Sequence, residues 1–579
     1  MKRMLLLILS ALALPAFAHA DTYPKDISAE VAKHLIVVDS EGRPRRPIVI
    51  QNDAGDMAKG EQPDYDIQLV PFSKQEDDFQ SHAAVKHEQD AYKVYLDQMM
   101  DAIEQSPRNT RVMVIVHGGM NFIKGAVGRA CADYATIQNS SCYYPIFICW
   151  DSNPLSTYAD GLVFNREGEY HREFPGVLYG ILTTPLEFVG DLGRAATRAP
   201  AVFANQTFGD LQTVIPSAFP EIQRANDRVP YMNESSKDGV AAWVGGRHSI
   251  PATSATTDAQ KKGRIIAGVG QRDKAPYEYP WRTVSYAATL PMKIVTAPLM
   301  DALGNKAWDQ MAARVEMMFR SDTEYNFDDT KGTAADAKWQ YNGGYAPPRG
   351  AVAVFIRRLM KFQHEQRTTA ALKADSDYMK VTLVGHSMGA MVINEIARYC
   401  NEQEDCYFPA EAKDTAANEV DPYHLYVSDV VFFAAACTTR EFESFTVPFI
   451  GRRLRQGENV EFYSLSLHPQ AELRETEAGD FVPRGSLLVW IDNYFSNPRT
   501  FYDKTFGQFD NALLSAQIIP PLLRSHVHLK AFKVGNDVLP PEMPQKHGDF
   551  LAMPDSENHL IPYWTRPFWT PQLPPYPKP

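Results

Sequence analysis

Short, unbroken apolar runs recur along the chain at the length of a β-strand. The clearest covers residues 112–116, where five apolar side chains follow one another. Runs of this kind are typical of strands that are buried on both faces of a parallel sheet. The pattern predicts strands over residues 34–38, 46–50, 66–70, 112–116, 146–150, 381–384, 429–436, 460–467 and 526–534.

Between these runs the hydrophobic spacing changes to that of helices. Over residues 84–105 apolar side chains recur at intervals of three and four, which places them on one face of a helix. The same spacing predicts a helix around residues 352–359 and another over 388–399. Strands that alternate with helices predict an α/β fold with a mostly parallel sheet and flanking helices.

This alternation stops between residues 155 and 345. The stretch has helical patterns, as over residues 311–319, but no strand pattern of comparable strength. It is too long for a loop, so we expect a large, mainly helical inserted cap. The cap would divide the α/β domain into residues 21–154 and 346–560.

The two ends of the chain have compositions of their own. Lys2 and Arg3 precede an apolar stretch over residues 4–14, and Ala18-His19-Ala20 has the small-residue form of a signal-peptidase site. We therefore expect a bacterial signal peptide over residues 1–20, cleaved after Ala20, and a periplasmic or secreted protein. The last nineteen residues, 561–579, hold seven prolines, which predicts an extended tail packed on the surface.

Composition narrows the classes of function. The chain has 579 residues, 44% of them hydrophobic, and a formal net charge of −12. An acidic balance disfavours nucleic-acid binding, and no later stretch is long and apolar enough to predict a transmembrane helix. No CxxC or zinc-type spacing of Cys and His occurs, so neither a metal nor another cofactor is expected.

Export would make disulfides chemically accessible to the six cysteines. Cys131 with Cys142, and Cys400 with Cys406, each flank a short polar stretch that a disulfide could close. Cys149 and Cys437 stand in apolar runs, which predicts buried thiols. The spacing leaves open whether either pair is oxidised.

The strongest chemical motif is Gly385-His386-Ser387-Met388-Gly389. A predicted strand precedes it and a predicted helix follows directly, which is the context of a nucleophile elbow. The two glycines let strand and helix approach closely around a strained serine. We therefore expect Ser387 to be a nucleophile at the carboxyl edge of the sheet.

A second motif, His117-Gly118-Gly119, directly follows the strand at residues 112–116. Acyl transfer places negative charge on a carbonyl oxygen, which fixed N–H donors must stabilise. The motif predicts an oxyanion hole in which the N–H of Gly119 or Met120 acts with the N–H of Met388. The side chain of His117 is expected to support this loop rather than to transfer protons.

The expected general base is His547, one of fifteen histidines. It lies in a loop after the last predicted strand, from which a side chain can reach Ser387 across the sheet edge. His526 and His528 are the alternatives, but the one-residue gap between them places both on one face of a strand, which favours a structural role.

The carboxylate that would orient this base should follow the strand before the last. Glu472 fits that position, and Asp492 is the other candidate, although Asp492 looks helical and a solvated helix face would explain it. Glu475 and Asp503 remain open as well.

With these motifs in this order, the chain resembles the α/β-hydrolase superfamily, and more loosely its lipases and carboxylesterases. The similarity covers roughly residues 105–155 and 345–555. It implies an α/β-hydrolase fold, no metal in catalysis, and hydrolysis of a small-molecule or lipid ester through an acyl-enzyme on Ser387. The sequence departs from the family pattern in the cap, which precedes the elbow, and in the long connection before the last strand.

Two other activities stay open at this point. A serine hydrolase could instead act on an amide, peptide or thioester bond, and a protein could keep the fold only to bind ligands. The apolar side chains of the cap would line a pocket for an acyl or aryl group or, as we favour, form the cap's own core. They are Trp281, Trp308, Met311, Met317, Met318 and Phe319.

Overall fold

The structure is a computed structural model, and it describes the chain in separate ranges. These are residues 25–53, 64–72, 82–108, 111–119, 121–153, 156–158, 165–166, 169–170, 189–204, 266–269, 280–319, 350–369, 378–407, 423–475, 481–496, 498–516, 518–532, 543–551 and 561–570. The predicted signal peptide, residues 1–20, lies outside them.

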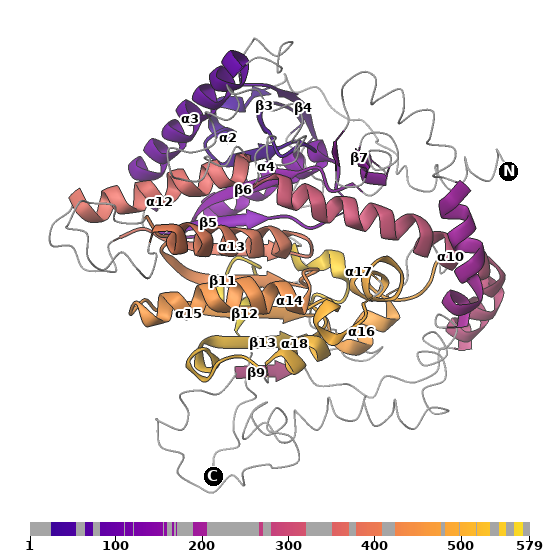
Figure 1. The fold of residues 1–579 in the computed structure, drawn as a ribbon. Coiled ribbons are helices and arrows are strands. Elements are labelled where there is room, and N and C mark those ends of the chain that lie inside the picture. Colours follow the sequence, from indigo (N-terminus) through magenta and orange to yellow (C-terminus); the bar gives the residue numbers. More distant parts are fainter. Residues whose placement is uncertain are drawn as a thin grey trace, which may run out of the picture.

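One mixed sheet of eleven strands runs through the described residues (Figure 1). Its strands are β1 (Lys25–Asp26), β2 (Leu35–Val38), β3 (Pro44–Asp53), β4 (Asp64–Val70), β5 (Arg111–Val116), β6 (Tyr144–Trp150), β9 (Ile266–Val269), β10 (Lys380–His386), β11 (Val427–Phe433), β12 (Glu461–Ser466) and β13 (Val527–Ala531). From one edge to the other, the parallel part has the order β2-β6-β5-β10-β11-β12-β13-β9. At the β2 edge, β3 pairs antiparallel with β2, β1 and β4. A separate hairpin joins β7 (Asn165–Arg166) to β8 (Glu169–Tyr170).

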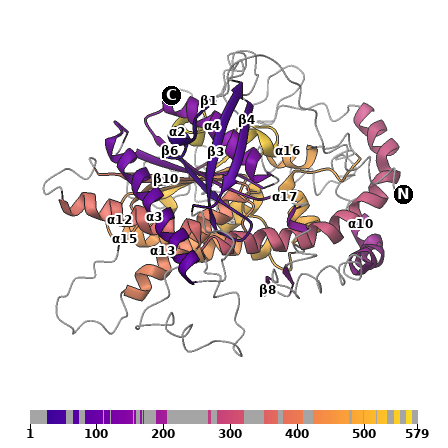
Figure 2. The ribbon, with the colours of Figure 1, turned by 90° about the horizontal axis from the view of Figure 1, so that it is seen from above.

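Helices cover both faces of this sheet. In Figure 2, α12, α13 and α15 lie on one side of the strands and α4 lies on the other. The helices and short helical turns are α2 (Ser28–Val31), α3 (His82–Gln105), α4 (Ile123–Ser140), α10 (Pro280–Met317), α12 (Ala351–Thr369), α13 (Gly389–Tyr407), α14 (Thr439–Glu441), η7 (Phe442–Thr446), α15 (Val447–Arg455), α16 (Pro469–Arg474), α17 (Leu487–Trp490), η9 (Ile491–Phe495), η10 (Phe501–Asp503), α18 (Phe509–Ser515), η11 (Pro521–His526), η12 (His547–Leu551) and α19 (Arg566–Trp569). The predicted α/β architecture, a mostly parallel sheet with flanking helices, is therefore confirmed.

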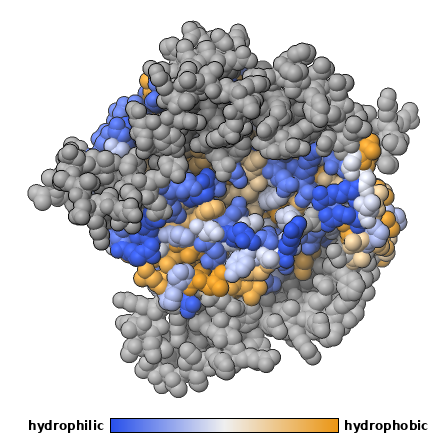
Figure 3. Space-filling model, viewed as in Figure 1, coloured by the Kyte–Doolittle hydropathy of each residue, from blue (hydrophilic) through white to orange (hydrophobic). Residues whose placement is uncertain are grey.

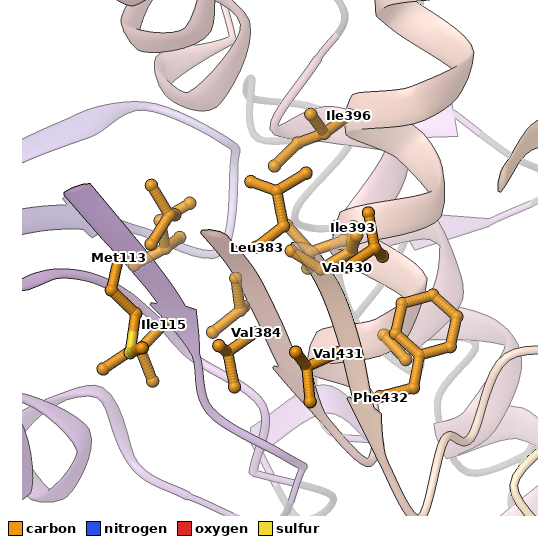
Figure 4. Packing of buried hydrophobic residues seen from close by; sticks show 14 of the residues in the cluster. Met113, Ile115, Leu383, Val384, Ile393, Ile396, Val430, Val431 and Phe432 are labelled. Atoms are coloured by element: carbon orange, nitrogen blue, oxygen red, sulfur yellow. The ribbon is translucent and has the colours of Figure 1, made fainter. Parts of the chain in front are cut away.

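The central strands are apolar on both faces because both faces are covered. Leu383 of β10 and Val430 of β11 point toward Ile393 of α13, whereas Val384 and Val431 point to the opposite side (Figure 4). All of these side chains are at most 1% exposed. Burying an aliphatic side chain of this size contributes about 1.5–3 kcal/mol, so the centre of the sheet is a rigid platform for the loops at its carboxyl edge.

Most of the expected elements agree with the structure, with small shifts at their ends. β11 ends at Phe433 instead of Ala436, because Ala434 adopts a φ of 42° and turns the chain away from the sheet. Helix α4, between β5 and β6, was not predicted. Its buried face consists largely of small residues, such as Ala126, Ala130 and Cys131, and a face with so few large apolar side chains gives a weak helical signal.

The inserted stretch, residues 155–345, is more closely joined to the sheet than we expected. Its described part is mostly helical, in α10 and in residues 189–204, but it also supplies β9, which pairs parallel with β13 at the edge of the main sheet. The sequence pattern indicates no strand of comparable strength here, and β9 is the strand that it misses. A four-residue strand, Ile266–Val269, carries too little pattern to stand out in a sequence.

The end of α10 belongs to the main hydrophobic core, not to a core of the cap's own. The residues that join the central cluster are Trp308, Met311, Val315, Met318 and Phe319. Met317 is half-buried, and the side chain of Trp281 lies outside the described residues. Gly42 packs its backbone against the carbonyl of Met317, where an added Cβ would lie 2.1 Å from that oxygen. The C-terminal end of α10 is thus anchored beside the antiparallel edge of the sheet.

Residues 561–570 are folded and partly buried, which corrects the prediction of an extended surface tail for this part of it; residues 571–579 lie outside the described residues. Within residues 561–570 the chain forms the helical turn α19, and Tyr563, Trp564 and Trp569 are at most 1% exposed. Tyr563 donates its hydroxyl proton to Asp133 of α4, and Lys530 of β13 donates to the carbonyl of Phe568. Aromatic side chains at this density pack as a core, which outweighs the extended tendency of the prolines.

Cys131 is a buried thiol and Cys142 an exposed one, so the disulfide that their spacing allows is not formed. Cys400 is buried, but the side chain of Cys406 lies outside the described residues, so the pairing of these two stays a prediction. Cys149 and Cys437 are buried, as predicted. Burial raises the pKa of both thiols well above the usual value, which makes them inert at neutral pH.

Hydrophilic residues cover much of the described surface on the face of Figure 1, around smaller apolar areas (Figure 3). Exposed apolar side chains occur at the turn from α18 to η11, at Leu514, Ile518 and Leu522. Among the described helices, none has the length and apolar character that a membrane span requires.

Trp569→Ala tests the buried position of the C-terminal segment. The indole is fully buried, so its removal should lower the free energy of unfolding by about 3–5 kcal/mol. Ile561→Ala in the same segment is the control, because Ile561 is 42% exposed and should cost far less. Chemical denaturation measures both variants. Equal, small effects would contradict a core role for this segment.

Candidate functional site

The Gly-x-Ser-x-Gly motif forms the turn between β10 and α13. Ser387 stands between the last residue of β10, His386, and the first residue of α13, Gly389. Its φ is 52°, a left-handed conformation that a serine adopts only where surrounding contacts enforce it. This geometry is the strand–turn–helix expected of a nucleophile elbow.

Three backbone hydrogen bonds hold the turn in this conformation. The N–H of Ser387 donates to the carbonyl of Phe433 at 2.8 Å, and the carbonyl of Ser387 accepts from Ala436 at 2.9 Å and from Ala390 at 3.1 Å. Two of these bonds join the elbow to the end of β11. The strained turn is thus fixed by the neighbouring strand as well as by its own helix.

The glycines of the motif permit close backbone contacts. A Cβ at Gly389 would lie 2.2 Å from the carbonyl oxygen of Val116, and one at Gly385 would lie 2.8 Å from the backbone of Ala390. Any side chain at either position would push the elbow away from β5 or from α13. Both glycines are therefore required by space.

The hydroxyl of Ser387 is buried and makes no hydrogen bond to the described residues. The residue is 1% exposed, and its Oγ has no hydrogen-bond partner among the described residues. A buried hydroxyl without a partner costs free energy. An unsatisfied group of this kind at a strained turn is the pattern of a functional residue rather than of a structural cap.

The loop after β5 lies directly against the elbow. A Cβ at Gly118 would meet the Cβ of Ser387 at 2.8 Å, and one at Gly119 would meet the side chain of Met388 at 2.6 Å. The sequence placed both segments in one site, and the structure brings them into contact. Met120 lies outside the described residues.

Polar side chains fix the direction of the peptide between Gly118 and Gly119. The carbonyl of Gly118 accepts hydrogen bonds from Asn121 Nδ2 at 3.1 Å and from Ser152 Oγ at 3.2 Å. In a planar trans peptide the N–H of Gly119 points the opposite way from that carbonyl. The loop thus holds one N–H in a set orientation, which is what an oxyanion donor requires.

His117 supports this loop, in agreement with the sequence-based expectation. The N–H of Trp150 donates to Nε2 of His117 at 3.1 Å, so the ring proton is on Nδ1, which faces the carbonyl of Gly118 at 2.7 Å. Burial lowers the pKa of His117 to about 4. A neutral ring with both nitrogens occupied has a structural role.

His547 lies against the elbow, at the start of the turn η12. Its carbonyl accepts a hydrogen bond from Nε2 of His386 at 2.9 Å, and the two imidazole rings are 5.2 Å apart. The ring of His547 is buried, and neither nitrogen has a hydrogen-bond partner among the described residues. The expected base thus packs against His386, the residue before the expected nucleophile, and no hydrogen bond joins its imidazole to the Ser387 hydroxyl.

Burial lowers the pKa of His547 to about 4. The ring is therefore neutral at pH 7, which is the protonation state in which it can accept a proton. Catalytic hydrogen bonds are often long or unmade in the absence of substrate.

Glu472 is buried three residues before Glu475, which bonds His547, but no hydrogen bond joins the Glu472 carboxyl to the imidazole. It lies in α16, after β12, and its Oε2 accepts from the hydroxyl of Ser486. Its Oε1 has no partner among the described residues. Burial raises the pKa of Glu472 to about 8, and the nearby acids Glu475 and Asp492 add to this effect.

Asp492 hydrogen-bonds another segment of the chain, which corrects the alternative of a solvated helix face. Its Oδ1 accepts from the N–H of Thr505 at 2.9 Å, and its Oδ2 accepts from Gln508 Nε2 at 2.7 Å. Burial raises the pKa of Asp492 to about 6. These bonds fix the loop over residues 505–511.

That loop in turn supports the end of β11. The N–H of Gly507 donates to the carbonyl of Ala435, and the N–H of Phe506 donates to that of Cys437, both at 2.8 Å. The N–H of Ala436, between them, is the donor to Ser387. Asp492 is therefore linked to the elbow indirectly, through the 505–511 loop and then through residues 435–437.

The alternative histidines and the remaining acid lie elsewhere. His526 ends η11 instead of standing in the strand, but it shares Glu461 with His528, at 3.1 and 2.8 Å. Their structural role agrees with the expectation. Asp503 bonds Arg440 at 2.8 Å and Thr500, and these bonds lower its pKa to about 2.

The sequence assigned no role to His386, and it left Glu475 only as an open candidate for the orienting acid. His386 occupies the variable position of the motif, where the pattern itself assigns no role. Glu475 Oε2 accepts the N–H of His547 at 3.0 Å. Only the fold brings β10, α16 and η12 together, so no spacing in the sequence could have indicated either contact.

Within the described ranges, no group of three or more His, Cys, Asp or Glu side chains is arranged to hold a metal ion. Comparison of the chain with family models, with curated proteins and with solved structures finds no match. The functional assignment accordingly depends on the geometry of the site and on the sequence motifs.

Gly389→Ala tests the close contact between the elbow and β5. The new Cβ would overlap the carbonyl of Val116, so we expect a loss of about 1–3 kcal/mol or more in the free energy of unfolding. Gly125→Ala, in α4, is the matched control, because no atom lies within 4 Å of its added Cβ and alanine favours a helix. Thermal denaturation compares the two. A Gly389→Ala protein as stable as the control would disprove the close approach.

Proposed function

We propose that this protein is a serine hydrolase that cleaves carboxylic esters, with Ser387 as nucleophile and His547 as general base. The observation that carries the proposal is the positive φ of Ser387, at a strand-to-helix turn whose hydroxyl has no other partner. The glycine loop of residues 117–119, in contact with that turn, supports the same reaction.

The reaction would proceed through an acyl-enzyme. The Ser387 oxygen attacks the ester carbonyl while His547 accepts its proton, and the N–H groups of Gly119 and Met388 hold the oxyanion. The imidazolium then donates that proton to the leaving alcohol. Water, deprotonated by the same imidazole, attacks the acyl group and releases the acid. No metal or other cofactor has a part in these steps.

Glu472 remains our proposed acid for this base. A buried carboxyl beside a newly formed imidazolium would shift toward its ionised form, because an adjacent positive charge lowers its pKa. Glu475, three residues further along, bonds the backbone of His547, which keeps this segment next to the base. Asp492 is a weaker candidate, since its two carboxylate oxygens already accept from the 505–511 loop.

The order of elements supports the resemblance to the α/β-hydrolase superfamily. β5 precedes the glycine loop, β10 precedes the elbow, and His547 follows β13, the last strand of the sheet in sequence. We propose that the inserted stretch, residues 155–345, shapes the acyl pocket, and that the protein is exported by its first twenty residues. A small-molecule or lipid ester is the proposed substrate.

A fluorophosphonate probe tests the nucleophile. Such probes react with activated serines, so the wild type should be labelled at Ser387 and should hydrolyse short p-nitrophenyl esters. Ser387→Ala should abolish both, whereas Ser428→Ala, at the opposite end of the neighbouring strand, should preserve both. Because burial lowers the pKa of His547 to about 4 and raises that of Glu472 to about 8, the labelling rate should rise through pH 4 and again toward pH 8, where Glu472 ionises.

Several outcomes of this experiment would change the account. Full ester turnover by Ser387→Ala would refute the assigned nucleophile. Labelling at Ser387 with turnover of matched amides or thioesters, and not of esters, would redirect the proposal to those bonds. An unlabelled Ser387 without turnover would leave a binding protein.

Glu472→Gln and Asp492→Asn distinguish the two acids. Glu472→Gln should lower kcat about 100-fold or more with little change in KM, because a neutral amide cannot stabilise the imidazolium. Asp492→Asn should mainly lower thermal stability, since an amide nitrogen would face the donors of Thr505 or Gln508. Steady-state kinetics with active-site titration measures both. The reverse pattern would assign the acid to Asp492.

A further inference from the structure

Both main-chain groups of His547 are hydrogen-bonded to side chains of the site. The carbonyl accepts from Nε2 of His386 at 2.9 Å, and the N–H donates to Oε2 of Glu475 at 3.0 Å. The imidazole itself has no partner among the described residues. The structure therefore holds this residue by its backbone and leaves its ring available.

We propose that His386 and Glu475 are positioning residues that align the general base through its main chain. His386 holds the carbonyl of His547, and Glu475 holds its N–H. The inference rests on the proposed function, because it assigns His547 the role of base. This main-chain positioning differs from the role of an orienting carboxylate, which would bond a ring nitrogen of His547.

His386 is suited to this role by its protonation state and by its place in the chain. A carbonyl oxygen carries no proton, so Nε2 of His386 must donate, and in the neutral ring Nδ1 is then unprotonated. Burial lowers the pKa of His386, which keeps the ring neutral. Since His386 directly precedes Ser387, a single hydrogen bond fixes the neighbour of the nucleophile against the residue that supplies the base.

Glu475 is held in place by its own backbone. Its N–H donates to the carbonyl of Ala471, and its carbonyl accepts from the N–H of Gly485 at 2.9 Å. With the main chain fixed at the end of α16, one carboxylate oxygen reaches the N–H of His547. An amide oxygen could accept the same bond, so the positioning role needs an acceptor and does not need the negative charge.

The far end of the turn has an anchor of its own. Arg129 of α4 donates to the carbonyl of Leu551 at 2.7 Å, and Phe550 stacks on Phe433 with ring centres 5.9 Å apart. Loss of the His386 bond would therefore free the first residue of η12 while its last residues stay docked. The expected result is a displaced ring in a folded protein.

The test for His386 compares His386→Gln, which can still donate a proton to the carbonyl, with His386→Leu, which cannot. Misplacement of a reacting group by about 1 Å can cost about 100-fold in rate. We expect His386→Leu to lose about 10- to 100-fold in kcat per titrated site with KM little changed. His386→Gln should recover a substantial part of that loss.

His34→Leu is the matched control. His34 is also buried and also hydrogen-bonds a backbone carbonyl, that of Pro145 at 2.7 Å, but it lies just before β2, at the opposite edge of the sheet from the elbow. It should lower the melting temperature and leave kcat per titrated site unchanged. If His386→Leu behaves in the same way, the bond is merely structural and the proposal fails.

Glu475→Gln and Glu475→Leu separate the acceptor from the charge. Glu475→Gln should retain far more of kcat than Glu475→Leu, because only the latter lacks an acceptor. An equal, steep loss in both variants would show that the negative charge is used, and Glu475 would then be the orienting acid instead of a main-chain anchor.

Hydrogen exchange of residues 543–551, measured by mass spectrometry, gives a result that does not depend on turnover. The amide of His547 should exchange faster in Glu475→Leu than in Glu475→Gln, and in His386→Leu than in His386→Gln. Equal protection of the His547 amide in each pair of variants would overturn the main-chain clamp, that is, the pair of bonds from His386 and Glu475 to the main chain of His547. If wild-type Ser387 is not labelled by the fluorophosphonate but exchange follows the prediction, the proposed function fails while the clamp stands.

Discussion

The whole site depends on how closely three segments of backbone approach one another at the carboxyl edge of the sheet. The elbow at Ser387 is compressed between the end of β5 and the first turn of α13, and only glycine fits at positions 385 and 389. This close contact forces Ser387 to a φ of 52°. A strained residue costs about 1–3 kcal/mol, which the fully buried sheet around β5, β10 and β11 can sustain.

The strain is supported by successive layers of backbone. The end of β11, with Ala434 also in a left-handed conformation, bonds both the N–H and the carbonyl side of the elbow. The loop over residues 505–511 bonds that end, and Asp492 fixes the loop. Asp492, a candidate for the catalytic acid from its position in the sequence, is thus joined to the elbow only through the 505–511 loop and the end of β11.

How much the sequence could predict follows from the range of each interaction. The buried strands, the elbow and the glycine loop depend on local patterning, so apolar runs and motifs indicate them directly. β9 and the end of α10 depend on partners far along the chain, Val527–Ala531 for β9 and Gly42 for Met317, and their local signals are weak. The C-terminal segment was misjudged because proline content outweighed the aromatic residues that bury it. The contacts of His386 and Glu475 with His547 arise only when β10, α16 and η12 come together.

The central claim is that one strained serine, an adjacent imidazole and two backbone N–H groups form a single reactive centre. A crystal structure of the phosphonylated protein measures this most directly. The account predicts phosphorus on Oγ of Ser387, the phosphoryl oxygen within hydrogen-bond distance of the N–H groups of Gly119 and Met388, and the His547 ring in contact with the adduct. An adduct with the phosphoryl oxygen directed away from residues 118–119, or with the ring of residue 547 remote from it, would contradict the account.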